Sequence, residues 1–200
     1  MNHPLPSPPL ADPAVLELLR EAAAWRLMAL FFESPDARWP EQIAALATEA
    51  ADAQLAEAAV AAQTGASKGL HDSTFGPGGP AAPREVSYRD AVLSGKLLAE
   101  LEHLYAAFAY RPSTPEPPDH VAVEAGFVAY LYLKEAYARS AAEEEAAAVT
   151  RAAREAFLAE HVACVAGPLA ASLAASPITY LRLAAGALAQ RVPCTGPASS

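Results

Sequence analysis

The chain has 200 residues, a formal net charge of −9 at pH 7 and a composition that is 53% hydrophobic. A hydrophobic fraction this large excludes a wholly disordered chain. The three lysines, Lys68, Lys96 and Lys134, are widely spaced, so no basic surface of the kind that binds nucleic acid is expected. An acidic surface suits a basic partner such as an arginine-bearing peptide, although many cytosolic proteins are acidic simply for solubility.

The composition predicts an all-α fold, formed as a single globular helical domain. Alanine, leucine, glutamate and arginine, which favour helices, dominate the sequence. Isoleucine occurs only at Ile43 and Ile178, and β-branched residues are generally scarce.

The helices can be placed in chain order from caps and apolar periodicity. Residues 1–11 are proline-rich and predict a disordered N-terminal arm. Asp12 and Pro13 then form a helix-start signal, and one all-helical domain is expected over 12–191, before a frayed tail over 192–200. The predicted helices are 13–33, 40–63, 94–109, 118–139, 141–167 with a break at Pro168, and 177–191.

Two segments are predicted to be loops. Residues 64–86 are rich in glycine and proline and form a long loop. The sequence GPGG within it lacks the following Lys-Ser/Thr pair of a phosphate-binding loop. Residues 110–118 form a hinge loop that prolines stiffen.

The cysteines and the hydropathy pattern predict a cytoplasmic protein. Cys164 and Cys194 lack CxxC spacing and zinc-ligand companions, so two reduced thiols are expected. The N-terminus has neither the basic nor the apolar region of a secretion signal. The most apolar window, VACVAGPLAASLAAS, is too short for a membrane span and contains Pro168.

The stretch PSTPEPPDHVAVEAGFVAYLYL, residues 112–133, carries the clearest functional signal. His120 and Glu124 are four residues apart and share a helix face, while Asp119 lies in the first turn. Asp119 can be a helix cap, and His120 can be an ordinary ring bonded to Glu124. The same residues can also form a patch that recognises a guanidinium, bordered by aromatic rings. The rings in question are Phe127, Tyr130 and Tyr132.

Two catalytic interpretations compete with these. A metal site would need a third ligand, which His103 or His161 could supply, but the sequence has no HExxH. An acid–base dyad of His120 with Asp119 or Glu124 would lack a recognisable nucleophile. An all-α small-molecule-binding or regulatory domain is a further alternative.

The block EPPDHVAVEAGFV resembles the E-x-P-D-H-x-x-x-E-x-x-F-M motif of the TorD/DmsD/NarJ family, cytoplasmic chaperones for molybdopterin oxidoreductases of the DMSO reductase family. Other blocks of the chain resemble that family in the same order, over about residues 15–190. These blocks are WRLMALFFESP, FGPGGPAAPREVSY, LEHLYAAFAY, FLAEHVACVAGPLAASL and YLRLAAGAL.

The resemblance implies a chaperone without catalytic activity. It would bind the twin-arginine signal peptide of a catalytic subunit until the molybdenum cofactor is inserted. It implies no cofactor or metal of the chain's own, no nucleic-acid partner, no membrane span, and a monomer or a domain-swapped dimer. The peptide-binding residues that it implies are Pro118, Asp119, His120 and Glu124, with Glu116 on the rim and Phe127, Tyr88 and Tyr105 as further candidates.

Overall fold

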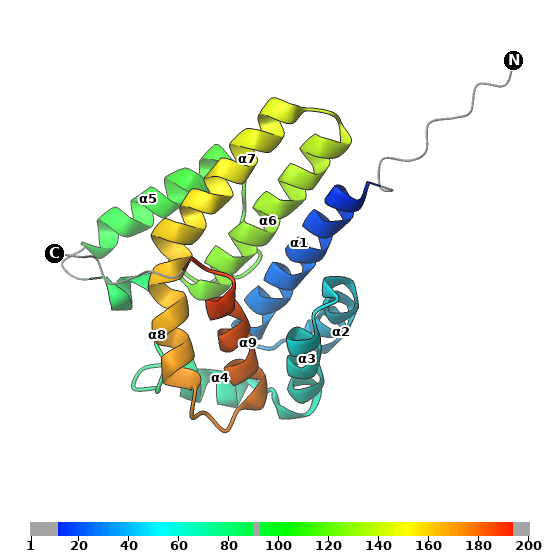
Figure 1. The fold of residues 1–200 in the computed structure, drawn as a ribbon. Coiled ribbons are helices and arrows are strands. Elements are labelled where there is room, and N and C mark those ends of the chain that lie inside the picture. Colours follow the sequence, from blue (N-terminus) through cyan, green and yellow to red (C-terminus); the bar gives the residue numbers. More distant parts are fainter. Residues whose placement is uncertain (1–11, 90–92, 194–200) are drawn as a thin grey trace, which may run out of the picture.

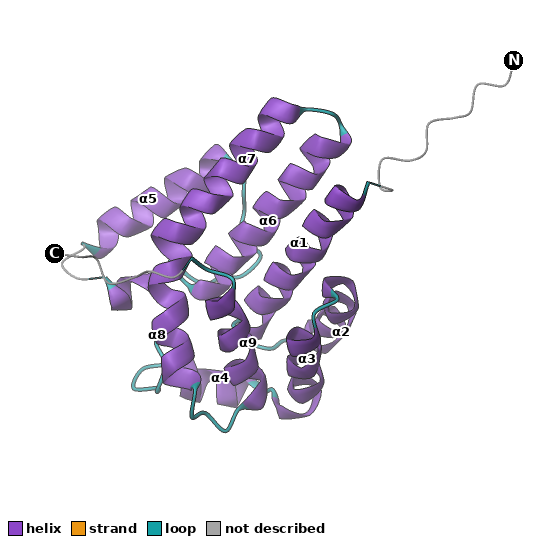
Figure 2. Ribbon diagram, viewed as in Figure 1, coloured by secondary structure: helices purple, strands orange, loops and turns teal. Residues whose placement is uncertain are grey.

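The computed structural model of the protein describes residues 12–89 and 93–193 (Figure 1). Helices joined by loops make up this part of the chain, and no named strand occurs in it (Figure 2). The predicted all-α fold is therefore confirmed. The helices are α1 Pro13–Phe31, α2 Trp39–Ala50, α3 Ala53–Gly65, α4 Lys68–Phe75, α5 Ser94–Ala107, α6 Val121–Ser140, α7 Glu144–Phe157, α8 Ala163–Leu173 and α9 Thr179–Gln190, with a 3₁₀ turn η2 at Glu85–Tyr88 and a π turn η3 at Leu158–Val162.

The central pair of the fold is α1 and α6, which lie side by side along most of their length (Figure 1). Helix α1 starts as predicted, because the Asp12 carboxylate accepts a hydrogen bond of 2.9 Å from the backbone of Ala14. Every residue of α6 from Val121 to Ala129 is buried. Helix α7 packs on α6, α2 packs on α1, and α9 packs between α3 and α8. The N-terminal end of α6 therefore lies deep in the core.

The helix predicted over 40–63 is wrong as a single element. The chain reverses at Ala51, which adopts a left-handed φ of 51°. Asp52 then caps α3 by accepting a bond of 2.8 Å from Leu55, and its carboxylate also pairs with Arg191 at 2.6 Å. The local cap and the long-range ion pair together outweigh the helical propensity of the surrounding alanines.

The segment 64–86 is not purely a loop, because it contains α4. Ser67 caps this helix by accepting a hydrogen bond from Leu70. Helix α4 places His71 and Thr74 in buried positions. The arm predicted over 1–11 lies outside the described residues, as does 194–200 of the predicted tail.

Two further helix boundaries differ from the prediction. Pro168 lies inside α8 rather than ending a helix, and its neighbours Val165 and Leu169 are buried. Tertiary packing on both sides of the proline therefore offsets the backbone hydrogen bond that it removes. Helix α9 begins at Thr179 instead of 177, because Ser176 accepts a hydrogen bond from the backbone of Ile178.

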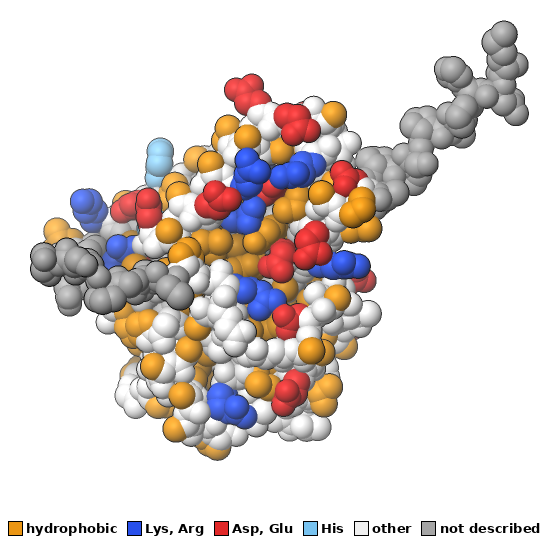
Figure 3. All heavy atoms as spheres, in the orientation of Figure 1, with side chains coloured by type: hydrophobic (Ala, Val, Ile, Leu, Met, Phe, Trp, Pro, Cys, Tyr) orange, Lys and Arg blue, Asp and Glu red, His pale blue; other side chains and the backbone are white. Residues whose placement is uncertain are grey.

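Within the described residues, one helical stretch, Glu144–Leu173, is long and apolar enough to cross a membrane by length and composition alone. Half of its most apolar window is buried inside the fold, which is equally typical of a core helix in a soluble protein. Charged side chains of both signs are interspersed on the face in Figure 3, with no large patch of one sign.

Candidate functional site

The predicted site lies where two loops meet at the start of α6. The end of the glycine-proline loop, residues 83–86, runs antiparallel to residues 119–121. The backbone of Val121 donates to Pro83 at 2.8 Å, and Glu85 donates to Asp119 at 2.8 Å. An antiparallel bridge joins Arg84 and His120 between these two bonds. Backbone hydrogen bonds thus join two segments that are about 35 residues apart in the sequence. We call residues 83–86 and 119–121 together the junction.

Asp119 is fully buried and already has a guanidinium partner from its own chain. Its carboxylate accepts bonds of 2.9 Å and 2.8 Å from Arg84 and one of 3.3 Å from the backbone of Val86. It does not cap α6. The carboxylate that the motif offers for a ligand arginine therefore stabilises the junction.

His120 is the residue that caps α6, and its side chain is only 3% exposed. The Nδ1 atom accepts a hydrogen bond of 3.2 Å from the backbone of Ala122, so the hydrogen of the neutral ring is on Nε2. The Nε2 atom lies 3.9 Å from the carboxylate of Glu116, not against Glu124. Burial, with smaller contributions from His71 and Arg84, lowers the pKa of His120 to about 3. The ring is therefore neutral at physiological pH.

Glu85 in the junction and Glu124 in the first turn of α6 are both fully buried, and neither oxygen of Glu124 has a hydrogen-bond partner within the described residues. Burial, followed by the charge of Glu85, raises the pKa of Glu124 well above its usual range. Burial also disfavours the charge on Glu85, but hydrogen bonds from His161 and Arg89 lower its pKa overall. His161 Nδ1 lies 3.2 Å from Glu85, and Arg89 forms an ion pair with it. Glu85 therefore carries the negative charge, and Glu124 holds the proton.

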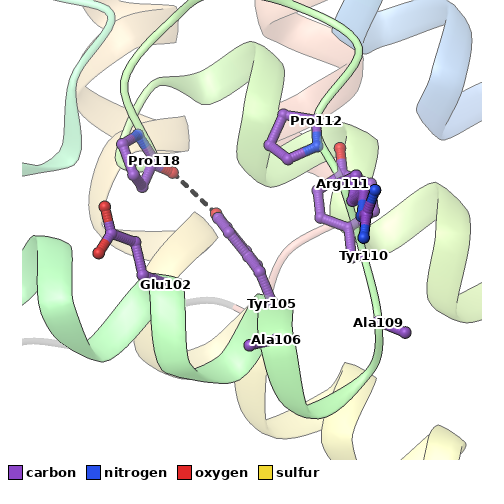
Figure 4. A pocket seen from close by; sticks show the side chains of 8 residues that line it. All are labelled: Glu102, Tyr105, Ala106, Ala109, Tyr110, Arg111, Pro112 and Pro118. Atoms are coloured by element: carbon purple, nitrogen blue, oxygen red, sulfur yellow. Dashed lines mark hydrogen bonds between the residues drawn. The ribbon is translucent and has the colours of Figure 1, made fainter.

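The aromatic candidates Phe127, Tyr105 and Tyr88 line neither cavity of the site, described below, and support its loops from within the core. Phe127 is buried, and its ring centroid lies 4.8 Å from those of both Tyr105 and Phe157. Tyr105 donates to the carbonyl of Pro118 at 2.8 Å, as Figure 4 shows, and Tyr88 donates to Ala82 at 2.8 Å. These hydroxyl bonds hold both loops against the core.

The other two rings named in the sequence analysis lie further along α6. Tyr130 donates to the carbonyl of Phe108 at 2.9 Å. Tyr132 lies beneath the guanidinium of Arg154, which is 3.8 Å from the ring centroid. Neither ring borders the Asp119 carboxylate as the sequence suggested, because Asp119 is enclosed by the junction.

Two open cavities flank the junction. The first, which we call the junction cavity, has a volume of about 350 Å³, and it is lined by prolines together with His71, Asp72, Phe75, Arg84, Glu116 and His120. The second, which we call the acidic cavity, has a volume of about 220 Å³ and contains three carboxylates without any lysine or arginine in its lining. These carboxylates belong to Glu33, Asp36 and Glu116.

Glu116 lines both cavities, so they are adjacent at its side chain. Of the predicted residues, Glu116 and His120 reach the junction cavity, whereas Asp119, Glu124 and Phe127 are enclosed. Sequence reasoning does not find His71, Asp72 and Phe75, because the glycines and prolines of 64–86 predict a loop where the structure has α4. The capping pattern at Ser67 was the available signal for α4. No local sequence pattern indicates that Glu33 and Asp36 belong to the site, because acidic residues at such positions ordinarily mark a helix end.

No group of three or more His, Cys, Asp or Glu side chains is placed to hold a metal ion within 12–89 and 93–193. His161, one of the suggested ligands, is committed to Glu85. His103 is exposed on α5.

The His120 ring should make the stability of the fold dependent on pH. Between pH 6.5 and the folded pKa of about 3, the unfolded chain binds a proton on this ring and the folded protein does not. The free energy of unfolding therefore falls as the pH drops below 6.5, by about 2 kcal/mol at pH 5 from this residue. Urea unfolding at pH 6.5 and at pH 5 measures this change in the free energy of unfolding.

His120→Asn is the matched control, because asparagine can accept the same bond from Ala122 but does not titrate. The raised pKa of Glu124 acts in the opposite direction, since stability from its protonated form is lost as the pH rises through that pKa. This contribution is common to both proteins and cancels in the difference between them. Identical pH dependence of the two proteins would show that the ring is not buried as described.

Comparison with known families gives one match. A family model described as nitrate reductase delta subunit matches residues 33–170, which is more than half of the chain. The matched range includes the junction and all lining residues of both cavities. No curated protein and no solved structure matches the chain.

Proposed function

The chain belongs to the nitrate reductase delta subunit family, whose members are chaperones for molybdoenzyme assembly, and from this premise we propose that it binds the twin-arginine signal peptide of a molybdopterin oxidoreductase. Binding takes place in the cytoplasm, on the apo catalytic subunit, before the molybdenum cofactor is inserted and the enzyme is exported. The protein acts by holding its client and has no catalytic role of its own.

The acidic cavity is the observation that supports this proposal most directly. Three carboxylates converge there, and no cationic residue belongs to its lining. Arg26 pairs with Glu33 from the α1 side. One oxygen of Asp36 accepts hydrogen bonds of 2.9 Å from the backbone of Arg38 and Trp39, so its other oxygen and the Glu116 carboxylate are the groups proposed to meet a ligand. Guanidinium groups form strong, directional hydrogen bonds with carboxylates arranged in this way. The two arginines of the signal would then occupy separate places. One would lie in the acidic cavity, and the other beside Asp72 and Glu116.

The junction cavity can receive the apolar part of the same peptide. Phe75 and the prolines of both loops provide an apolar wall next to the Glu116 carboxylate. His120 adds an Nε2–H donor, which can bond a backbone carbonyl of the peptide. Binding in the micromolar range requires about 8 kcal/mol, which partly exposed ion pairs alone do not supply. Apolar burial must provide much of the rest.

We call residues 110–118 the binding loop. Its prolines, and the hydrogen bond that the Tyr105 hydroxyl donates to Pro118, hold it in place before the ligand arrives. A loop that is already ordered loses little conformational entropy on binding. The buried carboxylates beneath the junction then serve to hold this loop, and the partly exposed carboxylates around it contact the peptide.

Replacing Glu116 with glutamine should weaken the binding of a twin-arginine peptide roughly three- to tenfold, because one carboxylate shared by both cavities is neutralised. Fluorescence anisotropy of a labelled peptide measures the dissociation constant. Binding should also weaken as the salt concentration rises.

Glu57→Gln is the matched control for long-range electrostatics. Glu57 is exposed on α3 and lines neither cavity, so this change alters the net charge equally without touching the site. If the two variants bind the peptide equally well, the acidic cavity is not the arginine site. A wild-type protein that ignores the peptide altogether would refute the proposal of signal-peptide binding.

A further inference from the structure

His71, on helix α4, lines the junction cavity although its side chain is largely buried. Only 6% of the residue is exposed, and its ring packs edge-on against Phe75, with the ring centroids 5.1 Å apart. The Nε2 atom lies 3.2 Å from the backbone carbonyl of Phe32. A carbonyl oxygen can only accept a hydrogen bond, so Nε2 carries a hydrogen. In the neutral ring, Nδ1 is therefore a free acceptor.

The Nδ1 atom of His71 has no hydrogen-bond partner in the part of the chain that the structure describes. It faces the carboxylate of Asp72 at a distance of 3.5 Å. Two acceptors thus face each other, which leaves the buried nitrogen unsatisfied. Asp72 also lines the cavity and its side chain is 55% exposed, so a donor in the cavity can reach this pair along the carboxylate.

The other charges around this pair leave room for a cationic ligand. Lys68 contacts Asp72 from the preceding turn of α4, but its side chain is 71% exposed, and such exposed pairs stabilise little. Arg84 lines the same cavity and is bound to Asp119, which offsets its charge. Glu116 adds a second carboxylate to the lining. A ligand cation that replaces Lys68 at Asp72 would therefore meet a net negative environment.

A guanidinium fits the acceptor pair of His71 and Asp72 better than an ammonium does. It is planar, and its fork of N–H groups can donate to a carboxylate oxygen and to a neighbouring acceptor at once. An ammonium is a compact, strongly hydrated point charge. Lys68 illustrates the difference, because its Nζ lies 3.4 and 3.3 Å from the two oxygens of Asp72, while His71 Nδ1 remains without a donor.

We propose that His71 and Asp72 together bind one of the two arginines of the signal peptide, and that His71 makes this position selective for arginine over lysine. The inference rests on the proposed function, since the ligand is the same peptide. One guanidinium N–H donates to Nδ1 of His71, another donates to the carboxylate of Asp72, and Lys68 turns into solvent. The ring is held in position for this contact by its bond to Phe32.

Peptides in which one or the other arginine is replaced with lysine test this selectivity. At one of the two positions, the lysine peptide should bind the wild-type protein about tenfold more weakly, because it cannot satisfy both acceptors. In His71→Phe this preference should disappear, since phenylalanine keeps the ring contact with Phe75 and offers no acceptor. Affinity for the lysine peptide should stay close to the wild-type value. Fluorescence anisotropy of the labelled peptides measures all of these dissociation constants.

His103→Phe is the matched control, because His103 is exposed on α5 and lines neither cavity, so the preference for arginine should persist. Asp72→Asn provides a second test that does not disturb the bond to Phe32. The new amide can donate to Nδ1 of His71 and remove the free acceptor, so the preference should be lost here as well. Circular dichroism checks that each variant is folded.

A preference for arginine that is equal in the wild type, His71→Phe and Asp72→Asn would overturn the inference and leave signal-peptide binding intact. Ring ¹⁵N spectra of the free protein at neutral pH offer an independent check. A hydrogen already present on Nδ1 of His71 would also overturn the inference, because the acceptor would then be absent. Wild-type protein that binds neither the arginine nor the lysine peptides would instead refute the proposed function itself.

Discussion

Replacing Asp119 with alanine is expected to lower the free energy of unfolding by about 2–3 kcal/mol, even though Asp119 belongs to the motif that suggests ligand binding. The side chain is fully buried, and its carboxylate holds Arg84 and the backbone N–H of Val86. Alanine leaves that N–H without a partner and opens the junction. The expected loss of stability is smaller than for a wholly buried ion pair, because the Arg84 side chain is 37% exposed and can turn toward water. Urea denaturation of the purified variant measures the loss.

Asp72→Ala is the matched control, since it removes the same charge from a side chain that is 55% exposed in the junction cavity. It should cost less than about 0.5 kcal/mol of stability. A double-mutant cycle between Asp119→Ala and Arg84→Met isolates the ion pair, and the double variant should be less destabilised than the sum of the single changes. If Asp119→Ala left stability unchanged and abolished peptide binding, Asp119 would be a ligand contact and the junction would not be as described.

Replacing Glu135 with alanine is expected to cost more, about 3–5 kcal/mol, because it leaves a cation buried without a counterion. Glu135 is 1% exposed and accepts bonds of 2.9 Å from Arg139 and 2.6 Å from Arg154. The Arg154 guanidinium lies 3.8 Å from the centroid of the Tyr132 ring, and its side chain is only 10% exposed. This contact joins α6 to α7, which carries Phe157 beneath the binding loop.

Thermal or urea unfolding measures the effect of Glu135→Ala, and Glu145→Ala on the exposed face of α7 serves as the control, with an expected change below about 0.5 kcal/mol. Combining Glu135→Ala with Arg154→Met should recover a large part of the stability, because methionine removes the unpaired charge and still packs on the Tyr132 ring. A small effect of Glu135→Ala by itself would mean that Arg154 is solvated and that the pair does not hold the two helices together.

The candidate site illustrates why a motif can be located from sequence when the roles of its residues cannot. The sequence predicts a helix from 118 with His120 and Glu124 on one face, whereas α6 begins at Val121, so that Glu124 lies in its first turn and His120 is the cap residue before it. The same spacing suggested that they bond each other, yet His120 accepts a hydrogen bond from the backbone of Ala122, and Glu124 has no hydrogen-bond partner within the described residues. Which of several possible partners a side chain takes depends on the segments that fold over it.

The sequence by itself determined the helical class, the start of α1 at Asp12 and Pro13, and the position of the binding loop ahead of α6. These features follow from propensity, capping and apolar periodicity, which act between residues a few positions apart. Only the tertiary structure decided that Asp119 pairs with Arg84 and that Glu85 pairs with His161, 76 residues away. The physical reason is burial: enclosed charges must find partners wherever the fold supplies them, and the acids that the proposed function assigns to the peptide are the half-buried Glu116 and the exposed Asp36.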